Sequence, residues 1–368
     1  MRLVDAYCGT GGWSAGAIAA GCTPVLGIDC DNVPLQLWAA NCAPAGRAAC
    51  ATLGTDEPVD WPEAEPDVHV HLSPPGTSLS KARAGSAPAE SVAAALDAVR
   101  WSVQLVLDRG YASWSLENVA TPGVVACLRD LAQQHPTRVA FMVLDAAEYG
   151  VPSSRVRLIA STPEAIRALK EVPVRRVSVA EAFSVAGVPL PSDWIKSNTT
   201  NRDGSPCVRS VRRHPARCPP HISSRRTLTH AAATPLRQVQ QPSFTVTASH
   251  PLIWARRDGT TVRCLTVAES AVLMGFAPGW KLPSGSRAGL RAVGNAVPPP
   301  LACAVMTAAT GRAHAPEALP PPSPESPSTS SEEPPLPATT LAELQGSVRR
   351  IKRRLDELER RAEPARVP

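Results

Sequence analysis

The first thirty residues of this sequence restrict its fold more than any other stretch. Residues 2–7 alternate as a β-strand does, and the run Cys8-Gly-Thr-Gly-Gly12 follows. Glycines between a strand and a helix let the backbone approach a ligand and direct free N–H groups at it. A second predicted strand, 24–28, ends at Asp29, and an acidic residue in this place commonly binds ribose hydroxyls. The pattern predicts a nucleotide-type βαβ unit and leaves its ligand open.

Strands and helices continue to alternate through the first half of the chain. Further strands are predicted at 49–53, 67–72, 112–116, 138–144 and 157–160, and helices at 33–40, 87–107 and 122–134. After a loop-rich stretch, we expect a strand at 244–248 and helices at 267–274 and 301–309. Strands that alternate with helices predict an α/β fold with a mostly parallel sheet covered on both faces.

One loop of this sheet is unusual. Leu72–Ser80 reads Leu-Ser-Pro-Pro-Gly-Thr-Ser-Leu-Ser and follows a predicted strand. Each proline fixes its own φ and pushes the preceding residue out of the helical region, so the loop should be extended and rigid. Such a loop can hold a reactive group at the edge of a parallel sheet, where α/β ligand sites lie. At its centre stands Gly76, which has no side chain.

Several blocks of the sequence resemble, in the same order, those of the DNA cytosine-C5 methyltransferase family. They are Asp5–Gly16, Pro74-Pro75, Glu117-Asn118-Val119, Tyr149–Pro152 with Arg155-Val156-Arg157, Arg263–Ser270 and Gly294–Pro298. The resemblance extends from Met1 to about Thr310. It implies a Rossmann-like, SAM-dependent methyltransferase fold with a small irregular target-recognition domain.

The resemblance also implies a chemistry. In this family a cysteine thiolate adds to C6 of a cytosine that has been flipped out of duplex DNA, and C5 then takes the methyl group of S-adenosylmethionine (SAM). The implied roles are ring N3 for Glu117, and the cytosine O2 and an adjacent phosphate for Arg155 and Arg157. The implied cofactor contacts are Tyr7, Gly9, Gly11, Gly12, Asp29, Pro74 and Asn295.

Gly76 occupies the position of the nucleophilic cysteine in this resemblance. We therefore expect methyl transfer to be lost or strongly reduced, and the glycine to leave open the space of the missing thiol. Thr77, Ser78 and Ser80 offer hydroxyls, but a hydroxyl needs a dedicated base. The nearest histidine, His71, lies on the preceding predicted strand, and the sequence does not give its direction.

A basic stretch follows the first sheet-forming half. Residues 196–237 carry nine basic side chains and one acid, Asp203, a net charge of +8. Such a stretch is typical of phosphate and guanine contacts with duplex DNA, and the alternative is a solvated basic loop. The predicted DNA contacts are Arg209, Arg212, Arg213, Arg217, Arg225 and Arg226. We expect no metal site, because the spacing of Cys207, His214, Cys218 and His221 fits no standard zinc finger.

The sequence predicts five segments. They are a SAM-binding catalytic domain at 1–185, a basic target-recognition domain at 186–260, the return of the catalytic domain at 261–312, a disordered Pro/Ser/Glu-rich linker at 313–340 and a helical tail at 341–362. Apolar residues spaced by three and four between 341 and 358 fit either a short coiled coil that pairs two copies or a single helix.

The composition of the chain bounds its location. Ten cysteines include no Cys-x-x-Cys pair, which favours reduced thiols inside a cell. We expect no secretion signal and no membrane-spanning run, and the cytoplasm, the nucleus and a viral origin all stay open.

Together with the basic stretch, the resemblance implies a protein that binds SAM and duplex DNA and flips a cytosine, with little or no methyl transfer. The alternatives are a natural non-catalytic SAM- and DNA-binding protein and a tRNA cytosine methyltransferase, since one branch of the family acts on tRNA.

Overall fold

The computed structural model describes residues 1–42, 44–54, 59–79, 87–190, 207–210, 236–248, 252–255 and 261–311. All of them belong to one compact unit, Met1–Pro322. A second unit, Ser323–Pro368, lies outside the described residues, and so do the predicted linker and helical tail.

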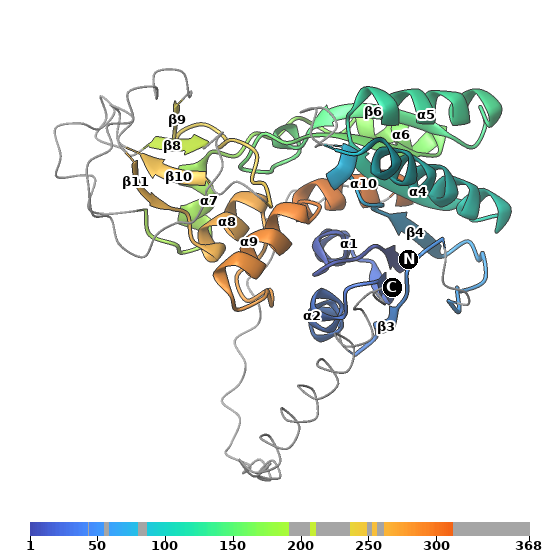
Figure 1. Ribbon diagram of the computed structural model, residues 1–368, viewed down its shortest axis with the longest axis horizontal. Coiled ribbons are helices and arrows are strands. Elements are labelled where there is room, and N and C mark those ends of the chain that lie inside the picture. Colours follow the sequence, from blue (N-terminus) through green and yellow to red (C-terminus); the bar gives the residue numbers. More distant parts are fainter. Residues whose placement is uncertain are drawn as a thin grey trace, which may run out of the picture. The chain divides into compact units, whose positions relative to one another are not determined.

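The centre of this unit is a seven-stranded sheet with the order β3-β2-β1-β4-β5-β7-β6. Figure 1 labels β3, β4 and β6 of this sheet. Its strands are β1 (Arg2–Ala6), β2 (Thr23–Asp29), β3 (Arg47–Cys50), β4 (Val68–Leu72), β5 (Ser113–Val119), β6 (Ala140–Asp145) and β7 (Val156–Ser161). The first five are parallel, and β7 runs antiparallel to both of its neighbours. The prediction of a mostly parallel α/β sheet is confirmed.

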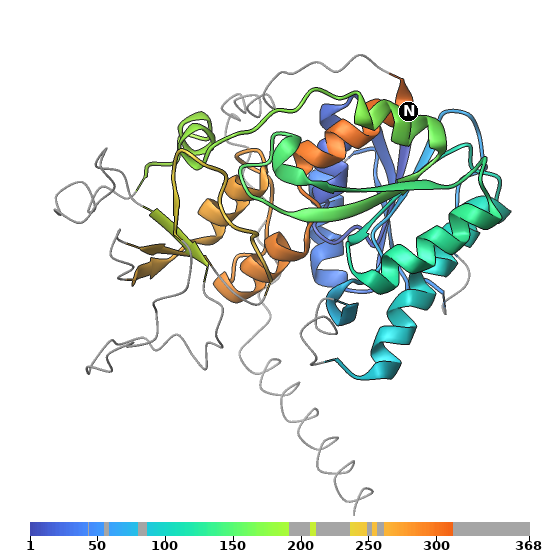
Figure 2. The same cartoon turned by 90° about the horizontal axis from the view of Figure 1, so that it is seen from above.

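Helices cover both faces of the sheet, as the sequence predicts. On one face α4 (Ala89–Asp108) and α5 (Pro122–Gln134) share a core with β1, β4 and β5. On the other, α1 (Gly12–Ala19), α6 (Pro163–Lys170) and α10 (Pro299–Thr310) pack together. The end of the described chain thus lies against its beginning, since α10 packs on α1 (Figure 2). A further helix, α2 (Asn32–Cys42), packs beside β2 and β3.

The two faces of β4 differ in character. Val68, Val70 and Leu72 are fully buried in the core beneath α4 and α5. His69 and His71 alternate with them, and both imidazoles are also fully buried. The opposite face of the sheet therefore contains polar groups, and these require hydrogen-bond partners inside the protein.

A second sheet has four antiparallel strands in the order β11-β10-β8-β9. They are β8 (Cys207–Ser210), β9 (Leu236–Gln238), β10 (Leu252–Ala255) and β11 (Thr261–Cys264). Trp254 on β10 packs edge-on against Phe183 of α7 (Val179–Val185), with ring centroids 5.8 Å apart. The same core includes α8 (Val267–Met274) and α9 (Ser286–Asn295). This sheet therefore takes strands from both sides of the predicted boundary at 260/261.

The predicted strand at 244–248 is wrong. Backbone pairing in this region is a single bridge between Ser243 and Ser153. The segment is held instead by side chains, because Thr245 donates its hydroxyl to the Ser154 carbonyl at 2.6 Å and the Arg237 guanidinium lies 4.5 Å from the centre of the Phe244 ring. Alternating apolar and polar residues indicate an extended chain, and among the described residues no neighbouring strand pairs with this segment in a ladder.

The sequence analysis expected no apolar run of membrane-spanning length, but one stretch reaches that length. Ser286–Thr310 is long and apolar enough to cross a membrane by length and composition alone. In the structure it is divided into two helices, α9 and α10. Of its most apolar 18-residue segment, 61% is buried inside the protein.

Candidate functional site

The glycine-rich loop after β1 is held in place by Asp29. One carboxylate oxygen of Asp29 accepts the Gly9 N–H at 2.8 Å, and the other accepts the Asp31 N–H at 2.9 Å. Tyr7 has a φ of 61°, and Gly9 and Gly11 have φ values of 52° and 87°. A left-handed tyrosine is strained, and such strain concentrates at functional sites. A Cβ added at Gly9 would meet no atom within 4 Å, so a ligand can approach the backbone there.

Two other glycines of the first block allow residues 297–299 to pack directly against it. A Cβ at Gly12 would lie 2.3 Å from the Val297 carbonyl oxygen, and one at Gly16 would lie 2.1 Å from that of Pro299. Only glycine permits an approach this close. The block that contains Asn295 therefore folds back beside the first block, as the resemblance implies, and Asn295 itself is exposed at the end of α9.

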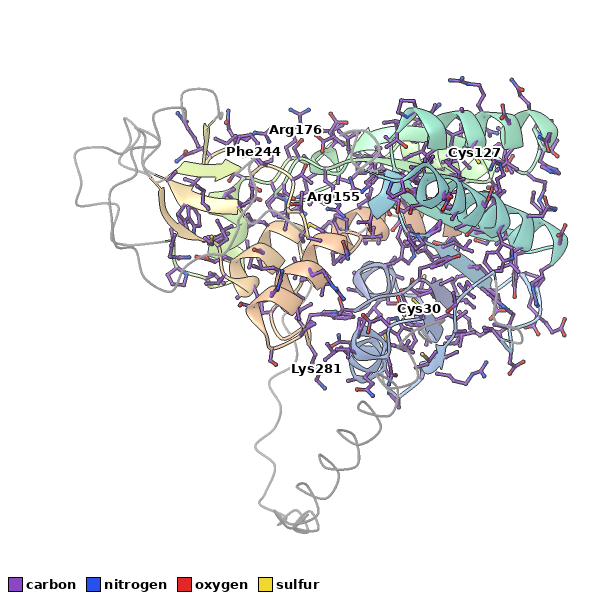
Figure 3. The ribbon with its side chains drawn as sticks, viewed as in Figure 1. Cys30, Cys127, Arg155, Arg176, Phe244 and Lys281 are labelled. Atoms are coloured by element: carbon purple, nitrogen blue, oxygen red, sulfur yellow. The ribbon has the colours of Figure 1, made fainter. Side chains whose placement is uncertain are left out.

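Sequence reasoning missed a second contact with the glycine-rich loop. Trp280, between α8 and α9, donates its indole N–H to the Thr10 carbonyl at 2.9 Å. Next to it, Asn41 of α2 exchanges two hydrogen bonds with the Lys281 backbone, at 3.0 and 2.9 Å. Lys281 is labelled in Figure 3. A tryptophan in a Pro/Gly-rich loop was the available signal, but nothing in the sequence connects it with residue 10.

A buried carboxyl supports this loop from below. Asp5 is 1% exposed and accepts the Ser14 hydroxyl at 2.6 Å, and Ser14 in turn accepts the Trp38 indole N–H at 2.9 Å. Burial raises the pKa of Asp5 from 3.8 to about 7, despite these hydrogen bonds.

Asp5→Asn is expected to stabilise the protein at pH 8. Because the folded-state pKa of Asp5 is raised, the folded state holds a proton that the unfolded state loses, and stability falls as the pH rises from about 4 to about 7. Asparagine does not titrate, so urea unfolding should show a gain of roughly 2–4 kcal/mol at pH 8 and little change at pH 4. Asp97→Asn at an exposed site is the control. Equal effects of Asp5→Asn at both pH values would contradict the assignment.

The Gly76 loop is tied to β5 through Asn118. The Asn118 amide N–H donates to the Pro74 carbonyl at 2.9 Å, and its amide oxygen accepts the Val119 N–H at 2.8 Å. A Cβ at Gly76 would lie only 2.9 Å from that same oxygen. The expectation of open space at Gly76 is therefore wrong, because the buried Asn118 side chain fills it and must shift before any side chain fits at this position.

Glu117 lies within β5 and not at its end, and it pairs with Arg157. The Arg157 Nε lies 2.7 Å from the Glu117 Oε1, and the two side chains are 13% and 10% exposed. Burial lowers the pKa of Arg157, and the Glu117 carboxylate opposes that shift. The structure thus brings together two of the predicted catalytic side chains as a nearly buried ion pair, which was the structural alternative for Glu117.

Arg155 lies just before β7 and is 3% exposed. Its guanidinium donates to the carbonyls of Val246 at 2.9 Å, Gly294 at 3.1 Å and Ala296 at 3.0 Å (labelled in Figure 3). These hydrogen bonds join three segments that are distant in sequence. They fit a clamp between segments better than a contact with a base.

The predicted DNA contacts fall almost entirely outside the described residues. Arg209 lies on β8, opposite Ile253 of β10. Arg212, Arg213, Arg217, Arg225 and Arg226 lie outside the described residues, as do His214, Cys218 and His221. Across the described ranges, no three His, Cys, Asp or Glu side chains are arranged to hold a metal ion.

Comparison with known families supports the resemblance. Residues 137–310 match the model of the C-5 cytosine-specific DNA methylase family. The similarity to this family covers a little under half of the chain. The matched range contains Arg155, Arg157 and Asn295 but begins after Gly76 and Glu117.

Solved structures resemble the chain over a longer range than the family model. A protein assigned as a DNA modification methyltransferase, encoded within a prophage (E. coli), aligns with a TM-score of 0.54 and 16% identity, over 84% of this chain and 99% of its own. The Dnmt2 methyltransferase of S. pombe aligns with a TM-score of 0.50 and 12% identity, over 84% of this chain and 98% of its own. At these identities the likeness shows the methyltransferase fold alone. A search of curated proteins returned no match.

Proposed function

We propose that this protein binds SAM and duplex DNA and holds a flipped cytosine, and that its methyl transfer to C5 is lost or strongly reduced. One observation carries the proposal. In a methylase fold with an intact glycine-rich loop, the loop after β4 has Gly76 packed against Asn118 and offers no thiol. Glycine cannot add to C6, so the activation of C5 that the family uses is missing.

The residues around Gly9 fit SAM as the cofactor. The backbone at Gly9 is open to a ligand, and Asp29 fixes the loop from behind. Tyr7, Gly11 and Gly12 belong to the same loop and the helix start that follows it, the segment after Asn295 packs on Gly12, and Pro74 is fixed by Asn118. When bound, SAM supplies a methyl group on a sulfonium. The role of this chain is to position that group beside the Gly76 loop.

The Glu117–Arg157 pair fits the binding of a cytosine ring. The Arg157 guanidinium offers a donor for the cytosine O2, and the Glu117 carboxyl beside it is the group that would face ring N3. A pair that is already formed needs little reorganisation when a base arrives. We propose that this pair binds the base and that Arg155 acts as a positioning residue behind it.

The choice of nucleic acid rests on charge. The stretch 196–237, with its net charge of +8, is proposed to contact the phosphates of duplex DNA, Arg209 among them. We also propose an intracellular protein in which 186–260 reads the target and in which 341–358 forms either a pairing seam between two copies or a single helix. In a competition between duplex DNA and tRNA, the protein should retain the duplex DNA.

The test of the proposed function is binding without turnover. By titration calorimetry, the chain should bind SAM, and Asp29→Ala should weaken the affinity at least about tenfold because the Gly9 N–H loses its acceptor. Asp31→Ala is the matched control, since the Asp31 carboxylate accepts the Val33 N–H and an Arg291 N–H at the surface and does not contact Gly9. DNA retention should fall steeply with salt. A chain that binds neither SAM nor DNA would overturn the proposal.

A further inference from the structure

A continuous chain of hydrogen bonds runs between β4 and β5. The Ser73 hydroxyl lies 2.6 Å from His71 Nε2, and His71 Nδ1 lies 2.9 Å from the Ser115 hydroxyl. Ser115 also lies 2.8 Å from His69 Nε2, and His69 Nδ1 lies 2.8 Å from the Ser113 hydroxyl. Five side chains thus alternate between hydroxyl and imidazole, with every link at hydrogen-bond distance.

The middle of this chain is sealed, and its ends are not. Ser115 and both histidines are fully buried, whereas Ser73 and Ser113 are half-buried. Trp13 covers one of these histidines, because its indole stacks on the His71 ring with centroids 3.3 Å apart and planes 4° apart. The chain therefore connects the loop that contains Gly76 with solvent near the start of β5.

Both imidazoles are neutral in this setting. Burial lowers the pKa of His69 to about 3 and the pKa of His71 well below its ordinary value. Asp5 is the neighbour of His71 on β1, and burial raises its pKa to about 7, so it is charged only in part at neutral pH and provides a limited counter-charge. A neutral imidazole has one donor and one acceptor nitrogen, so the five groups satisfy one another in either of two directions. A shift of every proton by one link reverses the direction without charging a ring.

We propose that Ser73 is a nucleophilic hydroxyl, with His71 as its base and Ser115, His69 and Ser113 as a proton relay to solvent. A hydroxyl and a base within hydrogen-bond reach, with the base oriented by a third group, is the general signature of an activated nucleophile. The substrate class is an activated phosphoryl or acyl group. This activity does not depend on methyl transfer.

The relay allows the buried His71 to accept a proton without remaining charged. Ser73 Oγ forms a bond to the electrophilic atom, the leaving group departs with its electron pair, and the Ser73 proton passes to His71 Nε2. His71 gives its Nδ1 proton to Ser115, and Ser115 gives its own to His69 Nε2. His69 gives its Nδ1 proton to Ser113, which releases its own to water. No imidazolium has to persist in the core, where burial penalises charge.

The test uses a fluorophosphonate on the intact chain, with the labelled residue identified by mass spectrometry. The Ser73 oxygen should bond to phosphorus and release fluoride, giving one label per chain. His71→Gln should slow labelling at least about 100-fold, the size of a lost general base, and Ser115→Ala at least about tenfold. Two controls should change the rate less than about twofold. Ser78→Ala removes another loop hydroxyl, and Ser161→Ala removes a buried sheet serine whose hydroxyl donates to the Trp114 carbonyl.

A second measurement covers the case in which His71→Gln does not fold. Nitrogen-15 NMR reports which nitrogen of each imidazole carries the proton. In a connected relay, Ser113→Ala should change the tautomer ratio at His71, three links away, as well as at His69. The proposal fails if Ser73 is not labelled, if Ser115→Ala labels as fast as the native chain, or if Ser113→Ala alters His69 alone.

Discussion

Arg155→Ala is expected to lower the free energy of unfolding by about 4 kcal/mol, measured by urea denaturation at pH 7. The Arg155 side chain is almost fully buried and supplies three hydrogen bonds to backbone carbonyls. Truncation leaves those carbonyls without donors and opens a cavity where three segments meet. Both effects belong to the small set that produces large losses from one substitution.

Two variants make the Arg155 result specific. Arg155→Lys keeps a charge but offers no planar fork to reach carbonyls on different segments, so it should recover less than about half of the loss. Arg100→Ala removes an exposed arginine that pairs with Asp97 one helical turn away, and it should cost less than about 0.5 kcal/mol. A loss below about 1 kcal/mol for Arg155→Ala would show that the clamp does not hold the segments together.

Arg157→Met is expected to cost about 3–5 kcal/mol at pH 7, because it leaves the Glu117 carboxylate nearly buried and without its partner. The double variant Arg157→Met with Glu117→Gln removes both charges and should recover more than half of that loss. Urea unfolding of the native chain, both single variants and the double variant gives the coupling between the two side chains. A double variant no more stable than Arg157→Met would mean that the pair is not coupled in the folded protein.

The elements that sequence reasoning predicted best have local signals at both ends. The helix 267–274 was predicted with its observed bounds, and the structure supplies the reason in a capping box between Thr266 and Glu269 and a left-handed Gly275. The helix 122–134 begins with proline in the same way. The third strand has no such signals and lies at 47–50 instead of 49–53.

The candidate site was predictable by residue type but not by partner. Glu117 and Arg157 could be singled out from the sequence, but their pairing depends on the antiparallel register of β5 and β7. The contact between Gly76 and Asn118 depends in the same way on how the loop after β4 packs on β5. His69 and His71 alternate visibly with apolar residues, but their serine partners on β5 appear only once the β4–β5 register is known. Register is set by the whole sheet, so short-range patterns cannot supply it.

The central claim is that methyl transfer stops at Gly76. The direct measurement is the transfer of a labelled methyl group from SAM to duplex DNA by the native chain and by Gly76→Cys, with Gly76→Ser as the matched control for the contact with Asn118. The native chain and Gly76→Ser should transfer no label above background, and Gly76→Cys should exceed both by at least about 100-fold once Asn118 has shifted. Transfer by the native chain at a rate similar to that of Gly76→Cys would contradict the account.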